Sequence, residues 1–105
     1  MSYYVVYVTT SNKNEANIIA KTTVRENLAA CANILGKVTS VFRWENSIQN
    51  DDEYALILKT SEKNLEKITR RIQDLHSYSC PCIIGLKIEY GNADFLNWIS
   101  EQVKE

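Results

Sequence analysis

The chain has 105 residues, of which 45% are hydrophobic and 24% are charged, a composition typical of a folded globular protein. Its formal net charge is −1, so it carries no overall positive field that would attract nucleic acid or an anionic membrane. No apolar run approaches the roughly 18 residues that a membrane-spanning helix needs. We therefore expect a single domain over residues 1–105, with neither nucleic acid nor a membrane as a partner.

The start of the chain carries no export signal. An apolar run begins by residue 3, without the basic segment and cleavage site of a secretory signal peptide. The three cysteines are an odd number, which fits reduced thiols better than disulfides. We therefore expect a cytoplasmic protein, although a targeting segment removed before residue 1 would leave no trace here.

The first half of the chain alternates between strand and helix patterns. Residues 3–10 are all β-branched or aromatic, which is typical of a central strand covered on both faces. Residues 13–27 repeat apolar side chains at helical spacing behind a capping sequence in which Glu15 follows Asn12 by three positions. Residues 30–44 return to a strand pattern, and Gly36 within it predicts a bend or a bulge.

The second half repeats this alternation. We expect a polar connection over residues 45–52, in which Asn46 tolerates a left-handed backbone, and then a strand over residues 53–60. Ser61 is the expected cap of a helix that ends near His76, because Pro81 lies just beyond. Residues 83–90 predict a fourth strand, and the apolar stripe that follows it predicts a C-terminal helix.

This order of elements predicts an α+β fold. Strand, helix, strand, strand, helix, strand is the ferredoxin-like βαββαβ order, here with an extra C-terminal helix. Both central helices then cover one face of an antiparallel sheet. The other face and the long middle hairpin, with Phe42, Trp44, Ile48 and Tyr54, are too apolar to be left to water. We therefore expect the chain to self-associate through its sheets.

The densest coordinating chemistry lies between the second helix and the fourth strand. His76, Cys80 and Cys82 place an imidazole and two thiols within seven residues, and these groups suit a soft or divalent ion such as copper or zinc. In the simpler interpretation, Cys80 is a small buried apolar residue and Cys82 is an incidental replacement. Packing is also the expected role of Cys31, which lies between alanines, although it could be a further ligand.

A second candidate group combines Lys59 with Trp44, Glu45 and Tyr78. A lysine at the end of an apolar strand, near aromatic side chains, could line a pocket for a small anion between subunits. The alternative is an ion pair and aromatic contacts that hold subunits together. The sequence contains no catalytic triad that we can defend and no glycine-rich phosphate loop. We therefore expect neither catalysis nor an organic cofactor.

Several stretches match a family pattern in order and in spacing: residues 29–34, 38–40, 42–45, 59–60, 76–78, 81 and 91–99. Together they make the chain resemble the CutA divalent-ion tolerance proteins. The resemblance implies a homotrimer of ferredoxin-like subunits, built like the nitrogen-regulatory PII signal proteins, and an association with copper and other divalent ions. A PII-like role, with a small anionic ligand in the cleft between subunits, is the alternative.

The chain departs from this family at the turn around His76. The usual pattern there has proline where this chain has Ser77, and glutamate where it has Cys82. Some members carry a copper-binding cysteine in the first strand, where this chain has Val8. Of the copper ligands that the resemblance implies, only His76 is present, so a copper site does not transfer whole.

Overall fold

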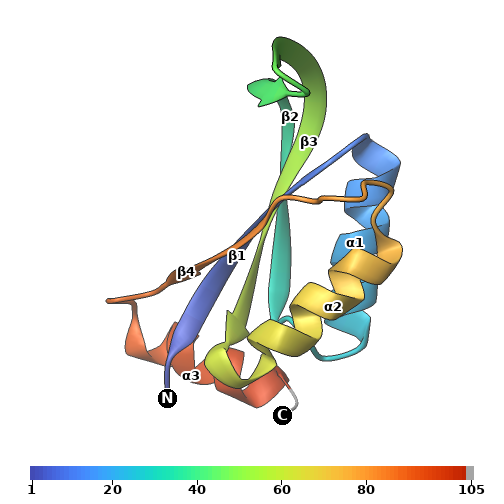
Figure 1. Ribbon diagram of the computed structural model, residues 1–105. Coiled ribbons are helices and arrows are strands. Elements are labelled where there is room, and N and C mark those ends of the chain that lie inside the picture. The colour runs from blue at the N-terminus through green and yellow to red at the C-terminus, as the bar shows by residue number, and fades with distance from the viewer. Residues whose placement is uncertain (104–105) are drawn as a thin grey trace.

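The computed structural model describes residues 1–103 as a four-stranded antiparallel sheet with helices packed against it (Figure 1). The sheet order is β2-β3-β1-β4. This architecture confirms the predicted ferredoxin-like α+β fold with an added C-terminal helix. The strands are β1 (Tyr3–Thr10), β2 (Cys31–Trp44), β3 (Ser47–Ser61) and β4 (Ile83–Lys87), and the helices are α1 (Lys13–Arg25), η1 (Glu62–Asn64, a short 3-10 turn), α2 (Leu65–Leu75) and α3 (Ala93–Gln102).

The core lies between the sheet and two helices. Figure 1 shows α1 and α2 side by side on one face of the sheet, with α3 at the end where β1 begins. Alternate positions of the two inner strands point toward the helices, since side chains on a strand alternate between its faces. The fully buried apolar side chains of this core include Val6, Val8, Ile19, Leu56, Leu58, Ile68 and Ile72.

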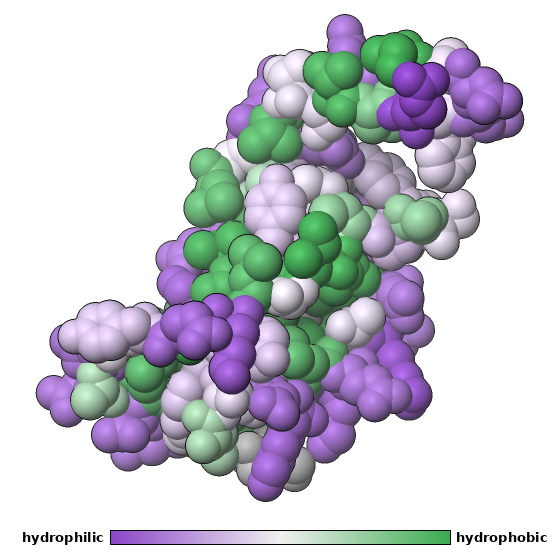
Figure 2. Space-filling model, turned by 60° about the vertical axis from the view of Figure 1, so that its left-hand side comes forward, coloured by the Kyte–Doolittle hydropathy of each residue, from purple (hydrophilic) through white to green (hydrophobic). Residues whose placement is uncertain are grey.

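The other face of the sheet is covered much less. Strand β1 is central, as predicted, but the expected cover on both of its faces is present only on the helix side, and Val5 and Tyr7 remain half-buried. Ile84 and Leu86 of β4 pair with these positions and are 50% and 56% exposed. Figure 2, which brings the β4 side forward, shows apolar side chains gathered across the middle of the molecule. We call the side chains of Val5, Tyr7, Ile84 and Leu86 the open sheet face.

The middle hairpin is longer than predicted. The expected polar connection over residues 45–52 is wrong, because only Glu45 and Asn46 turn the chain, with φ of 48° and 65°, as in the tight turns that join twisted strands. The pairing of β2 with β3 runs from Trp44↔Ser47 to Cys31↔Lys59. Polar side chains did not prevent pairing here, since the ladder is made by backbone groups. Beyond Thr10, where β1 ends, the hairpin continues as a two-stranded arm (Figure 1).

Three other boundaries differ from the predictions. Helix α1 ends at Arg25 rather than at residue 27, and Asn27 adopts a left-handed φ of 61°. The side chain of Ser61 makes no capping hydrogen bond, because the chain enters α2 through η1. Strand β4 ends at Lys87 instead of residue 90. Past this end, the backbone N–H of Ile88 still donates to the Tyr3 carbonyl at 2.9 Å. The end of α2 beside His76 is as predicted.

Gly36 is expected to be the most sensitive position of the edge strand. It follows the predicted bulge, which lies between Ile34 and Gly36, and its φ is 116°. A β-carbon there would meet no atom within 4 Å, so Gly36→Ala tests backbone strain alone. We expect a loss of about 1–3 kcal/mol in the free energy of unfolding, measured by urea denaturation. Thr39→Ala, an exposed control on the same strand, should change it by less than about 0.5 kcal/mol.

Candidate functional site: the cleft beside the β2–β3 arm

His76 is a structural side chain in this fold. Its imidazole is completely buried at the end of α2. The Nε2–H donates to the Thr9 carbonyl at 2.8 Å, and Nδ1 accepts the backbone N–H of Tyr78 at 3.1 Å. Both ring nitrogens are therefore used within the chain, so neither is free to bind a metal in this arrangement.

Glu15 fixes the same turn from the side of α1. Its two carboxylate oxygens accept the backbone N–H groups of Ser11 at 3.0 Å and of Ser77 at 2.9 Å. Burial is the largest single influence on this carboxyl group and disfavours its ionisation. The hydrogen bonds from Ser11 and Ser77, with the neighbouring His76, outweigh burial and lower the pKa of Glu15 below its usual value.

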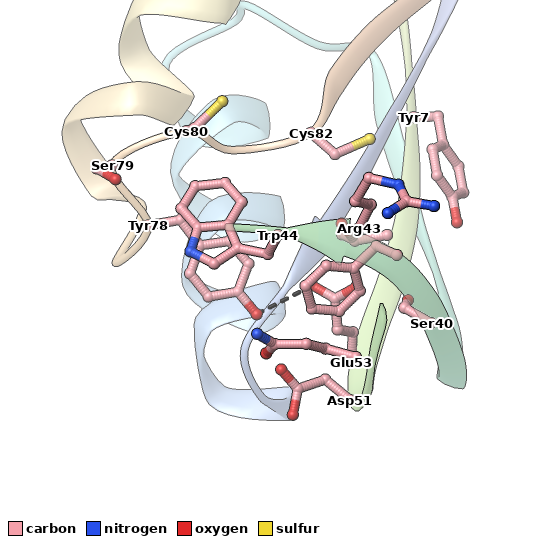
Figure 3. A pocket seen from close by; sticks show the side chains of 13 residues that line it. Tyr7, Ser40, Arg43, Trp44, Asp51, Glu53, Tyr78, Ser79, Cys80 and Cys82 are labelled. Atoms are coloured by element: carbon pink, nitrogen blue, oxygen red, sulfur yellow. Dashed lines mark hydrogen bonds between the residues drawn. The ribbon is translucent and has the colours of Figure 1, made fainter. Parts of the chain in front are cut away.

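Tyr78 then reaches from this turn across to β3. Its hydroxyl donates to Oε2 of Glu53 at 2.9 Å, and Glu53 is only 9% exposed (Figure 3). Burial, followed by the hydrogen bond to Glu53 and its negative charge, raises the pKa of Tyr78 to about 12. The phenol therefore remains a protonated donor through the neutral range.

These contacts build one wall of a cleft of about 680 Å³. The arm formed by β2 and β3 supplies another wall, and the segment before β4, with Cys80 and Cys82, borders a further side (Figure 3). The lining combines four aromatic rings with carboxylates, thiols and one guanidinium group. The lining residues include Tyr7, Phe42, Trp44, Asp51, Glu53 and Tyr78.

The predicted metal ligands do not form a cluster. Cys80 is exposed, Cys82 is half-buried, and both border the cleft as free thiols (Figure 3). Within residues 1–103, no three histidine, cysteine, aspartate or glutamate side chains are placed to hold a metal ion. Cys31 lines a separate groove beside α1. The single chain therefore does not preassemble the His76, Cys80 and Cys82 site, and the role of the two thiols stays a prediction.

The second predicted group is only partly assembled. Trp44 and Tyr78 line the same cleft, whereas Glu45 lies in the turn at the tip of the arm. Lys59 is elsewhere on β3: its Nζ donates to Oδ1 of Asn33 at 2.5 Å and lies 5.8 Å from the centre of the Phe95 ring. One chain thus does not combine these residues into an anion site, and their meeting between subunits stays a prediction.

Sequence reasoning missed the central role of Glu53. The sequence pattern places Glu53 at the start of the strand predicted over residues 53–60, directly after Asp51 and Asp52, and gives it no role in a site. The available signal was its two-residue spacing from Ala55, which places both on one face of β3.

Known proteins share the sequence pattern of this chain. The sequence profile of the CutA1 divalent ion tolerance protein family matches residues 4–102. The chain belongs to this family. It is 40% identical over 101 residues to the chloroplastic protein CutA 1 of Oryza sativa. The match covers 96% of this chain but only 57% of that longer relative. It is 39% identical over 97 residues to the divalent-cation tolerance protein CutA of Thermus thermophilus, across 92% and 94% of the two chains.

Solved structures of CutA proteins have the same architecture. Crystal structures of CutA1 from Oryza sativa and of the Thermus thermophilus protein superpose with TM-scores of 0.97 and 0.95. The matches cover 100% and 97% of this chain, 96% and 99% of those chains, at 38% and 37% identity. The predicted family and fold are therefore confirmed.

Location is not decided by these relatives. The rice relative is named chloroplastic, and a structural neighbour from Archaeoglobus fulgidus is named periplasmic. Within residues 1–103, no helix is long and apolar enough to cross a membrane. The cytoplasmic location stays a prediction.

Tyr78→Phe tests the contact that joins the turn to the arm. The substitution removes the only hydrogen bond that the side chain of Glu53 makes within residues 1–103, so we expect a loss of about 1–3 kcal/mol in the free energy of unfolding at pH 7. Because folding raises the pKa of Tyr78, the wild type should also lose stability as pH rises from 10 toward 12, and the variant should lose less. Urea denaturation across this range measures both; Tyr90→Phe, at a 93% exposed position, is the control.

Proposed function

We propose that this chain acts in divalent-ion tolerance as a homotrimer, and that metal ions act on it through Cys80 and Cys82. Membership of the CutA1 divalent ion tolerance family carries the first part of the proposal. Relatives from Thermus thermophilus and Archaeoglobus fulgidus are named divalent-cation tolerance proteins, and the chain spans 94% and 96% of their lengths.

The open sheet face supports self-association. Ile84 and Leu86 lie beside half-buried Val5 and Tyr7, and burying such a surface is the usual reason for symmetric assembly. The two-stranded arm extends past the body of the chain and can reach a neighbouring subunit, since the molecule measures 44 Å along its longest axis and only 22 Å along its shortest.

Two accessible thiols support the metal-responsive part. Thiolates select soft ions such as Cu(I) and also bind Zn²⁺. His76 cannot join them without breaking its bonds to Thr9 and Tyr78, so the two sulfur atoms are the ligands that the turn can offer. Zn²⁺ takes four ligands in structural sites, so it would need donors from outside this pair.

The thiol proposal is tested by metal uptake of the reduced protein. We expect wild type to bind Cu(I) in native mass spectrometry and the Cys80→Ser, Cys82→Ser double variant to lose this uptake, because serine offers no soft ligand. Cys31→Ser, which removes the remaining cysteine, should bind like wild type. Undiminished uptake by the double variant would show that these thiols are not the ligands.

The trimer is tested on the open sheet face. Leu86→Glu should convert trimers into monomers in native mass spectrometry, because it places a charge in the surface that assembly would desolvate. Ile18→Glu, at a 44% exposed apolar position of α1 on the helix side, should leave the assembly unchanged. A Leu86→Glu variant that stays trimeric would exclude this face as the interface.

A further inference from the structure

Strand β2 is an edge of the sheet, and its first residues lack the usual protection of an edge strand. Within residues 1–103 it pairs only with β3, so every second residue leaves its backbone N–H and C=O groups outside the ladder. Natural edge strands avoid further pairing through bulges, prolines or charged side chains. The bulge of β2 comes only after Ile34, and residues 31–34 are Cys, Ala, Asn and Ile. This stretch is therefore able to accept another strand.

A groove runs beside this stretch, between α1 and the start of β2. Helix α1 packs against β2 (Figure 1), and the groove along their contact has a volume of about 540 Å³. Ala20, Lys21, Val24 and Arg25 line it from the helix, and their spacing of three and four residues places them along one side of α1. Ala32 lines it from the strand. The small alanine side chains on both sides leave room for another chain.

The groove carries positive charge and no negative charge. Apart from the Cys31 thiol, Lys21 and Arg25 are the only ionisable side chains of its lining, and both are exposed. Neither of these cations lies within 4.0 Å of a carboxylate of residues 1–103, and Arg25 acts on Glu26 only at longer range. Two cations beside an unprotected strand edge favour a partner strand with carboxylate side chains.

The spacing of the two cations specifies where those carboxylates stand. Lys21 and Arg25 are four positions apart on α1, which is a rise of about 6 Å along the helix axis. On an extended strand, side chains two positions apart share a face and are separated by about 6.7 Å. A strand laid along the groove therefore brings two acidic side chains at positions i and i+2 to the two cations, and the residue between them points away.

We infer that the edge of β2 at residues 31–34 binds an extended segment of a partner protein, with acidic side chains at alternate positions, as an added strand. Backbone hydrogen bonds to β2 supply the affinity, and Lys21 and Arg25 supply the specificity. This surface involves neither the open sheet face nor Cys80 and Cys82, so it goes beyond the proposed function. Its test uses the assembled, reduced, metal-free protein.

The probe is a heptapeptide, Thr-Val-Glu-Val-Glu-Val-Thr, blocked at both ends. It should shift the backbone amide resonances of residues 31–34 saturably and slow their exchange with solvent deuterium. The same peptide with glutamine in place of both glutamates should bind at least about fivefold more weakly, because it keeps the backbone and loses the charge. Two further versions carry N-methyl groups along one edge or the other. One of them should not bind, because a strand pairs through one edge.

Charge-removing variants identify the two cations. The Lys21→Gln, Arg25→Gln double variant should weaken binding of the glutamate peptide about tenfold, with no change for the glutamine peptide. The Lys13→Gln, Lys67→Gln double variant is the matched control. It removes the same charge from exposed positions of α1 and α2 that do not line the groove, so it should bind like wild type.

Four results would overturn the inference. The first is that all backbone N–H groups of residues 31–34 are already protected from exchange before peptide is added, which would show that a second copy of the chain occupies this edge. The second is the absence of a saturable shift with the glutamate peptide. The third is equal binding of the glutamate and glutamine peptides. The fourth is equal weakening by the two double variants.

Discussion

The buried imidazole of His76 is the contact on which the rest of the site depends. It joins the end of β1, through the Thr9 carbonyl, to the backbone of the turn at Tyr78, while Glu15 holds the same turn from α1. Three segments that are far apart in the sequence are thereby fixed at one point. Inside a protein such a network is stronger than in water and costly to leave half-made, so it determines where the turn runs.

The position of the turn determines the character of the cleft. Because His76 anchors one side of the turn, Tyr78 is held over β3 and gives its hydroxyl to Glu53. The long register of the arm brings Trp44 into the same cleft. The Tyr78 hydroxyl is a neutral donor, and it bonds only one oxygen of the Glu53 carboxylate.

Much of the fold could be predicted because hydrophobic periodicity is a local property. The strands, the helices and the bulge before Gly36 were all foreseen, and so was the end of α2 beside His76. The prediction for the arm was wrong because residues 47–52 form a strand through backbone pairing with β2, and their own side chains do not favour one. Trp44 and Tyr78, which the sequence places in one candidate group, line the same cleft, and their role in a site stays a prediction. His76 is predicted as a metal ligand, but its buried ring already uses both nitrogens in hydrogen bonds within the chain.

The sequence by itself determined the order of elements, the apolar faces and the family, because each depends on residue types at fixed spacing. Only the tertiary structure decided which polar groups are already satisfied. His76 uses both nitrogens within the chain, Lys59 lies near α3 instead of beside Trp44, and the buried side chain of Glu53 accepts the hydroxyl of Tyr78. The physical reason is that the chemistry of a titratable group depends on burial and on partners contributed by distant segments, and neither is encoded in its neighbours along the chain.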